Sequence, residues 1–299
     1  LLGSFNLTKY LIPPYRGSGY TFDFAQLKKD IPHVVRAMDN VVDRADYPLP
    51  AQGREARAKR RMGIGIAGLA NCLEAIGAPY GEKGFLQLQA EIQETILLGT
   101  YEASVRLAKE KGQFALFDEE KYTKGQFIKT LPAELVADIG QYGIRNSHLT
   151  SIAPTGTISL SADNISSGIE PVFEHEYKRT IIGPNGAFTE VVQDYGVHKL
   201  GVYGKSSDDV SVEEHIDVLL TATKYVDSAV SKTCNVPGSV DWEAFKDIYT
   251  GAYYGGAKGC TTYRMDGLIA GVLQSIKPDE EEEGGACRID PVTGRRECE

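Results

Sequence analysis

Long stretches with helical periodicity, separated by short apolar strands, are the feature that most constrains the fold of this chain. Between residues 22 and 42 apolar side chains recur at every third or fourth position, as in an amphipathic helix, and Pro32 predicts a break or kink within it. Further helices are predicted at 85–111, within 121–141, and at 212–232 and 242–255. Short apolar strands are predicted after residue 147 and at 258–264. This alternation predicts an α/β domain.

Composition narrows the class of protein further. Of the 299 residues, 42% are hydrophobic and 24% are charged, a balance typical of a folded, soluble protein. No stretch approaches the roughly 18 consecutive apolar residues that a membrane span needs, and the N-terminus does not resemble a signal peptide. The net charge of −9 argues against affinity for nucleic-acid backbones, which calls for a basic face. We therefore expect a cytoplasmic protein that binds neither membrane nor nucleic acid.

The five cysteines do not form the pattern of a secreted disulfide framework. Their number is odd and their spacing is irregular, which favours reduced thiols in a cytoplasmic protein. For Cys72, Cys234 and Cys260 the apolar context predicts plain burial. The five histidines show no metal-ligand spacing, so no metal site is predicted.

A glycine-rich segment matches the dinucleotide-binding pattern G-x-G-x-x-G letter for letter, as Gly63-Ile64-Gly65-Ile66-Ala67-Gly68. That pattern has physical meaning only between a strand and a helix inside a βαβ unit. A basic, helix-like segment precedes it here, and a long helix follows where a strand would be needed. We therefore reject the dinucleotide interpretation and expect close helix packing through small residues.

A second turn, at Ala153-Pro154-Thr155-Gly156-Thr157-Ile158-Ser159, carries the strongest local signal. A strand ends, a glycine permits a tight turn, and hydroxyl residues precede an amphipathic stretch. Such a turn can direct backbone N–H groups toward an anion. No lysine follows the glycine, so it is not a Walker-type loop. Ordinary helix N-capping by Thr155 or Thr157 explains the same spacing equally well.

The segment from Arg145-Asn146-Ser147 through Ser159, continued by Asn164-Ile165-Ser166-Ser167-Gly168-Ile169-Glu170-Pro171, resembles ribonucleotide reductase large subunits. Other stretches resemble the same family in the same order, over residues 1 to about 270: Leu2-Gly3-Ser4-Phe5-Asn6-Leu7, Arg61-Met62-Gly63-Ile64-Gly65, Pro79-Tyr80-Gly81, Ser231-Lys232-Thr233-Cys234-Asn235-Val236-Pro237 and Lys258-Gly259-Cys260-Thr261-Thr262-Tyr263-Arg264.

The resemblance implies a fold and a binding site. The fold is the C-terminal half of the family's ten-stranded α/β barrel over 1–276, followed by an acidic linker and cysteine-containing tail over 277–299. The reaction replaces the 2′-hydroxyl of a ribonucleotide with hydrogen through a cysteine radical. In this family the turn cradles the substrate phosphates, which assigns that role to Pro154, Thr155, Gly156, Thr157 and Ile158.

The resemblance also indicates which type of ribonucleotide reductase this is, through the residues at a position that the iron-dependent type uses for radical transfer. Iron-dependent large subunits carry a tyrosine pair near the position of Thr261-Thr262, and threonine forms no comparable phenoxyl radical. The resemblance therefore implies a radical made in place with adenosylcobalamin. The alternatives are an iron-dependent reductase and a non-catalytic binding or assembly half of a split reductase.

The C-terminal tail carries Cys287 and Cys298 after the acidic linker. In family members a mobile dithiol re-reduces the active-site disulfide, and a thioredoxin-like protein then reduces the tail. Arg295 and Arg296 would stabilise a thiolate there. A β-hairpin around residues 291–294, or half of a metal site, are the alternative interpretations.

The chain opens on Leu1-Leu2-Gly3 without an initiator Met, as the middle of a buried segment would. The family's asparagine–cysteine–glutamate loop, the substrate-reducing cysteine that precedes Leu1 and the allosteric nucleotide sites would all belong to a missing N-terminal half. We expect that half as a partner, and expect the isolated chain to be inactive.

Overall fold

The computed structural model describes residues 1–16, 19–183, 186–236, 238–264, 273–275, 288–289 and 296–297. It divides into two compact units. The first contains Leu1–His175 and Gln193–Ile269, and the second contains Glu176–Val192 and Ala270–Glu299, so far as those residues are described. The predicted boundary at 276/277 remains a prediction.

Parallel strands form the framework of the first unit. Strand β1 (Leu2–Asn6) pairs in parallel with β4 (Gly63–Ala67), and Ile64 of β4 forms a parallel bridge with Thr150. Ile152 then bridges Val230 in parallel, just before β7 (Thr233–Val236), which pairs in parallel with β8 (Thr261–Arg264). Neighbours in space therefore follow the order of the sequence. This confirms the predicted α/β class, although the described strands do not close into a barrel.

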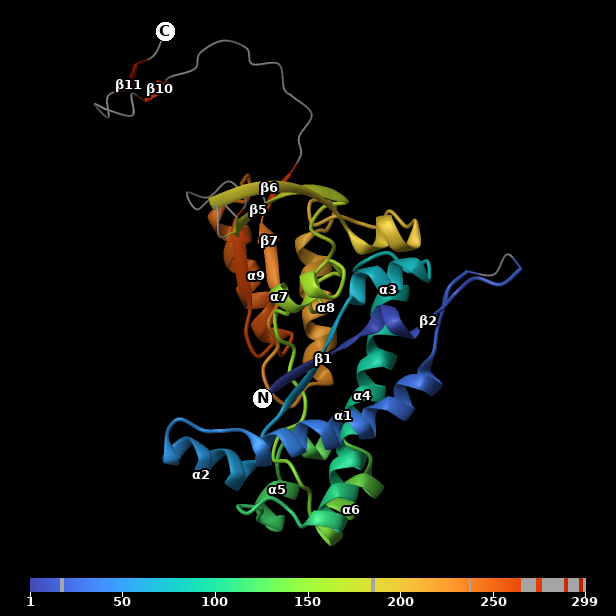
Figure 1. Cartoon of the computed structure of the whole chain (residues 1–299), viewed down its shortest axis with the longest axis vertical. Helices are drawn as coiled ribbons and strands as arrows, with labels where there is room; N and C mark the ends of the chain where they lie inside the picture. Colours follow the sequence, from blue (N-terminus) through green and yellow to red (C-terminus); the bar gives the residue numbers. More distant parts are fainter. Residues whose placement is uncertain are drawn as a thin grey trace. The chain divides into compact units, whose positions relative to one another are not determined.

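Helices connect these strands (Figure 1). The long helices α1 (Phe24–Arg44) and α4 (Lys83–Lys111) pack against each other, and α4 ends at Gly112, which adopts a positive φ of 83°. Helix α1 runs through Pro32 without a break, so of the predicted break or kink the break is wrong and the kink stays a prediction. The other helical segments are η1 (Leu7–Tyr10), α2 (Pro50–Lys59), α3 (Leu69–Ala75), α5 (Glu119–Thr123), η2 (Ile128–Thr130), α6 (Ala133–Tyr142), α7 (Gly156–Ser161), η3 (Gly196–Leu200), α8 (Val212–Lys224) and α9 (Trp242–Tyr254).

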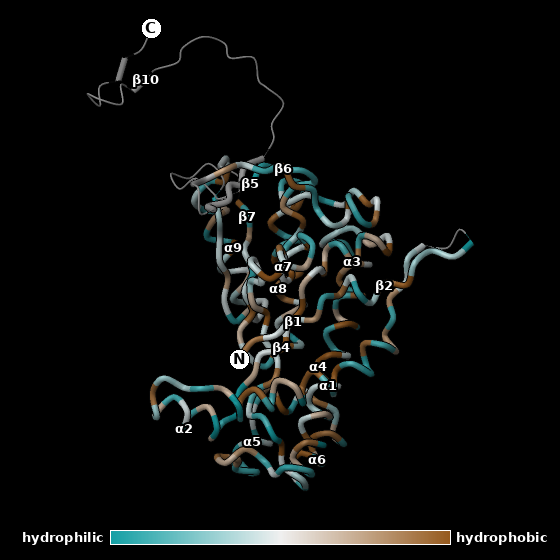
Figure 2. Tube along the Cα trace, in the orientation of Figure 1, coloured by the Kyte–Doolittle hydropathy of each residue, from teal (hydrophilic) through white to brown (hydrophobic). Residues whose placement is uncertain are grey.

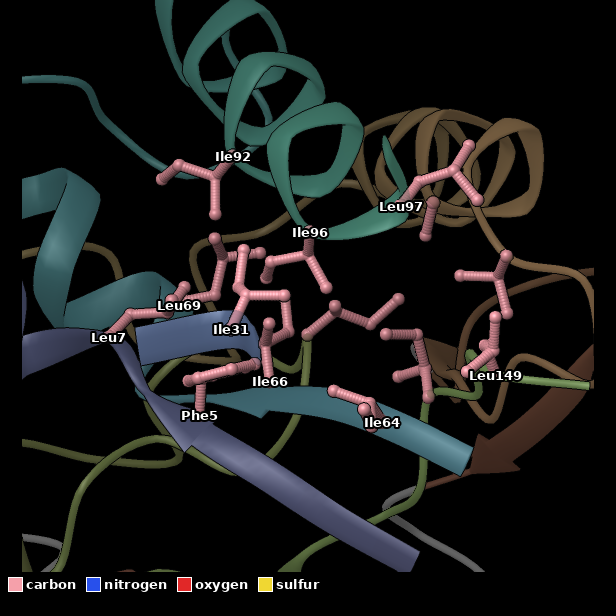
Figure 3. Close-up of a cluster of buried hydrophobic side chains, with 14 of the residues drawn as sticks. Phe5, Leu7, Ile31, Ile64, Ile66, Leu69, Ile92, Ile96, Leu97 and Leu149 are labelled. Atoms are coloured by element: carbon pink, nitrogen blue, oxygen red, sulfur yellow. The ribbon is translucent and has the colours of Figure 1, made fainter. Parts of the chain in front are cut away.

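The main core of the first unit lies between β1, β4 and the helices α1 and α4 (Figure 3). Phe5, Ile64 and Ile66 of the strands meet Ile31 of α1 and Ile96 of α4 there. Brown and teal residues alternate along the helices (Figure 2), as expected where only one face is buried. No helix among the described residues is both long enough and apolar enough to cross a bilayer.

The glycine-rich segment is a buried strand, so the prediction of close helix packing is wrong. Residues 63–67 form β4, and Gly68, which has φ 74°, directly precedes α3. A Cβ on Gly65 would lie 2.4 Å from the backbone oxygen of Ser151, and one on Gly63 would lie 2.8 Å from the Ser151 Cβ. These glycines allow the next strand to approach closely. They lie inside the strand rather than in the turn after it, where a pyrophosphate would bind.

Short antiparallel pairs complete the described residues. In the first unit, β2 (Leu11–Ile12) pairs with β3 (Thr21–Phe22). In the second unit, β5 (Glu176–Gly183) lies between β6 (Gly186–Gln193) and β9 (Leu273–Ser275). In the tail, β10 (Arg288–Ile289) pairs antiparallel with β11 (Arg296–Glu297), while residues 291–294, for which a hairpin was an alternative interpretation, lie outside the described residues.

Candidate functional site

The turn at residues 153–159 begins where a central strand segment ends. Ile152 donates its N–H to the Ala229 carbonyl at 3.1 Å, and its own carbonyl accepts from the Ser231 N–H at 2.9 Å. The backbone then reverses at Thr155, whose φ of 56° is in the left-handed region, and α7 starts at Gly156. The predicted order of strand, turn and helix start is confirmed.

The hydroxyl of Thr155 stabilises this turn from within. Thr155 is buried, and its Oγ1 accepts the N–H of Gly168 at 2.7 Å. A Cβ on Gly168, which has φ 53°, would lie 2.9 Å from the Ala153 oxygen. No side chain caps α7, so the alternative of ordinary N-capping by Thr155 or Thr157 is wrong. The Thr155 hydroxyl instead links the turn to Gly168, in the segment that follows α7.

The other residues assigned to phosphate binding form an accessible surface. Pro154, Gly156, Thr157 and Ile158 are exposed, and a Cβ on Gly156 would meet no atom within 4 Å. The first N–H groups of a helix have no acceptor within it. The structure therefore brings the five predicted residues together in one turn, with four exposed and Thr155 buried.

The segment after α7 is held against α3 by buried polar contacts. The Ser166 N–H donates to Asn71 Oδ1 at 2.6 Å, and the Ser166 carbonyl accepts the Gly68 N–H at 2.7 Å. Asn71 Nδ2 donates in turn to Asp194 Oδ2 at 2.7 Å. Burial raises the pKa of Asp194 to about 6. The turn thus rests on a rigid base.

A buried lysine fixes the far end of the same segment. Lys232 is fully buried, and its Nζ donates to Glu170 Oε2 at 2.5 Å and contacts His215 Nδ1 at 2.8 Å. Glu170 Oε1 also accepts the Thr233 N–H at 2.7 Å. Burial and then the Lys232 charge lower the pKa of His215 to about 3, so His215 is neutral. None of these side chains was assigned a role from the sequence; the lysine directly before β7, Lys232, was the signal available.

Thr261 and Thr262 lie on β8, as the predicted strand requires. Tyrosines lie beside them: Tyr263 follows directly, and the Tyr249 hydroxyl of α9 is 2.9 Å from Thr262 Oγ1. Helical spacing alone does not show this second contact, because it depends on how α9 packs against β8.

The cysteines differ in their surroundings. Cys72 and Cys234 are buried as predicted, but Cys260 is only partly buried, so the prediction of plain burial is wrong for it. Its Sγ lies 3.7 Å from that of Cys234. Cys287 and Cys298, the predicted redox pair, lie outside the described residues.

Comparison with known proteins decides the family. The model of the ribonucleotide reductase barrel domain matches residues 1–201 and 192–263. The chain belongs to the ribonucleotide reductase barrel family.

Relatives within this family are similar over most of the chain. A vitamin B12-dependent ribonucleoside-diphosphate reductase of Mycobacterium tuberculosis (strain CDC 1551 / Oshkosh) is 31% identical over 93% of this chain and 41% of that protein. One of Thermoplasma acidophilum is 29% identical over 94% of this chain and 38% of that protein. A ribonucleoside-diphosphate reductase subunit alpha of Haemophilus influenzae is 29% identical over 85% of this chain and 36% of that protein. The chain thus spans about two fifths of the length of these relatives.

Proposed function

We propose that this chain is the C-terminal part of the catalytic barrel of a ribonucleotide reductase that converts ribonucleoside diphosphates to deoxyribonucleotides. The family match and the names of the relatives support the reaction and the diphosphate substrate. The succession of parallel strands from β1 through β4 and residues 150–152 to β7 and β8 supports half of a ten-stranded barrel. The other half, and the radical-bearing cysteine, would come from the remaining length of the catalytic subunit.

The cofactor we propose is adenosylcobalamin, which would generate the radical next to the substrate. The relatives named vitamin B12-dependent support it, and so do the threonines at 261 and 262. No group of three or more His, Cys, Asp or Glu side chains among the described residues is arranged to hold a metal ion, and we assign none of these residues to the cofactor. We further propose that Cys287 and Cys298 exchange electrons with a thioredoxin-like reductant.

The assignment of the substrate phosphate site is supported by the open face of the turn at residues 154–158. Gly156 faces free space beside exposed backbone, while the Thr155 hydroxyl and Gly168 hold the loop from behind. An anion such as a nucleotide phosphate would find N–H donors there in a fixed position. Fixing the phosphate orients the ribose, and small displacements of a reacting group cost rate steeply.

Replacing Gly156 tests this site without disturbing the fold. A Cβ at Gly156 would meet no atom within 4 Å, so we expect Gly156→Val to fold normally but to cover the N–H groups. We expect kcat/KM for a ribonucleoside diphosphate to fall on the order of 100-fold in the reconstructed full-length enzyme. Gly251→Val on α9 is the matched control, because its Cβ also meets open space. Unchanged substrate affinity in Gly156→Val would refute the assignment.

A further inference from the structure

Two thiols that the substrate site does not use lie within reach of each other. Cys234 is on β7, opposite Thr262 of β8 in the parallel register, and Cys260 lies two residues before Thr262. Their Sγ atoms are 3.7 Å apart. A disulfide requires an S–S separation of about 2.0 Å, so the two sulfurs must approach each other further before the bond can form.

The two cysteines differ in their exposure to solvent. Cys234 is completely buried, with Val236 and Ile248 around it, whereas Cys260 is partly exposed at the edge of that cluster. A small oxidant in solution can therefore reach Cys260 and not Cys234. This is the arrangement of a redox thiol beside a resolving thiol.

The electrostatics favour the same division of roles. The contact with Cys234 lowers the pKa of Cys260 to about 7, and the Lys232 charge acts in the same direction. The pKa of Cys234 is raised, mainly by that contact and then by burial. Near neutral pH the proton of the pair therefore resides on Cys234, and Cys260 carries the thiolate that reacts with an oxidant.

We propose that Cys234 and Cys260 form a reversible disulfide, a modification site of the barrel domain that takes a peroxide as oxidant and a small dithiol as reductant. The Cys260 thiolate attacks hydrogen peroxide; an S–O bond forms, the O–O bond breaks, and hydroxide leaves. The Cys234 thiol gives its proton to that hydroxide, and its sulfur then attacks the Cys260 sulfenic acid. The S–S bond forms as the S–O bond breaks, and the departing hydroxide takes a proton from the solvent to become water. Two electrons pass from the thiols to the peroxide, and a dithiol returns them by exchange.

Peptide mapping of the full chain tests this pair directly. Cys287 and Cys298 are first replaced by serine, so that the tail contributes no thiol. Trypsin cuts after Lys232, Lys246, Lys258 and Arg264, which places Cys234 and Cys260 on different peptides. After brief peroxide treatment and alkylation, we expect these two peptides to be joined, lighter than their sum by two hydrogens, about 2 Da. Dithiothreitol should restore both thiols.

Single-cysteine variants test whether Cys260 reacts with the peroxide and Cys234 resolves the sulfenic acid. Cys234→Ala should abolish the linked peptide and leave Cys260 as a sulfenic acid that dimedone traps, whereas Cys260→Ala should leave Cys234 unmodified. Cys72→Ala, at a buried cysteine far from the pair in sequence, should keep the link. The proposal is overturned if both cysteines stay alkylatable after peroxide treatment. It is equally overturned if Cys260 in the Cys234-containing chain proceeds to sulfinic acid without a link.

Discussion

Two buried carboxylic acids, Glu74 of α3 and Asp194, accept hydrogen bonds from backbone N–H groups. Glu74 accepts the backbone N–H of Lys205 at 2.8 Å, and Asp194 accepts that of Gly196 at 2.6 Å. These bonds favour the ionised forms, but burial outweighs them and raises the pKa of Glu74 to about 7. The folded protein therefore binds a proton at Glu74 more tightly than the unfolded chain does.

Replacing Glu74 should change how stability depends on pH. Between about pH 4.5 and 7 the folded state holds more protons at Glu74 than the unfolded state, so the free energy of unfolding falls as pH rises and stays low above pH 7. Glu74→Gln removes this ionisation and keeps Oε1, which accepts both backbone bonds. At pH 8 we expect Glu74→Gln to be more stable by on the order of 2 kcal/mol, and at pH 4.5 to match the parent chain.

Urea unfolding at both pH values measures this difference. Asp194→Asn is the comparison, since the pKa of Asp194 is raised by burial to about 6 and the same effect should appear over a lower pH range. A Glu74→Gln variant that is equally destabilised at pH 4.5 and pH 8 would mean that Glu74 stabilises the fold through packing alone.

At the scale of elements, periodicity predicted the helices well and missed β4. Helices α1, α4 and α9 lie within two residues of their predicted ends, because one apolar face recurs over many turns. The predicted helix 212–232 ends at Lys224, and its last residues lead into the β7 strand instead. All five residues of β4 are buried, so its sequence lacks the alternation of apolar and polar residues that predicts a strand. Its glycines are also typical of a loop. The contacts of Lys232, Tyr249 and Cys260 depend on tertiary packing that periodicity does not encode.

We predict that the close approach of β4 to its neighbour requires glycine at position 65. A methyl group at Gly65 would lie 2.4 Å from the Ser151 backbone oxygen, which cannot move without separating two paired strands. We expect Gly65→Ala to lower the free energy of unfolding by about 3 kcal/mol or more. Gly251→Ala, in an exposed helical position, should instead raise it by about 0.5–1 kcal/mol. Chemical denaturation compares the two, and equal stabilities would show that β4 and the Ser151 strand separate at little cost.

For the whole enzyme, the proposal to test is that adenosylcobalamin, and not an iron-containing partner subunit, supplies the radical. We expect the reconstructed full-length subunit, assayed anaerobically with a dithiol, to reduce ribonucleoside diphosphates only when adenosylcobalamin is added. Tyr249→Phe and Tyr263→Phe should then leave turnover within about twofold, because no radical would pass through β8. Activity that instead requires an iron-containing partner subunit, and that these phenylalanine variants abolish, would establish the iron-dependent alternative.

The order of the strands has a consequence for how the chain is made. From β1 to β8, each parallel segment lies beside the one that precedes it in the sequence. A polypeptide leaving the ribosome therefore presents each of these described parallel segments to an edge that has already been synthesised, and none of them is inserted between two others. Assembly of these parallel strands can keep pace with translation, and a pause between strands leaves the growing edge exposed to aggregation.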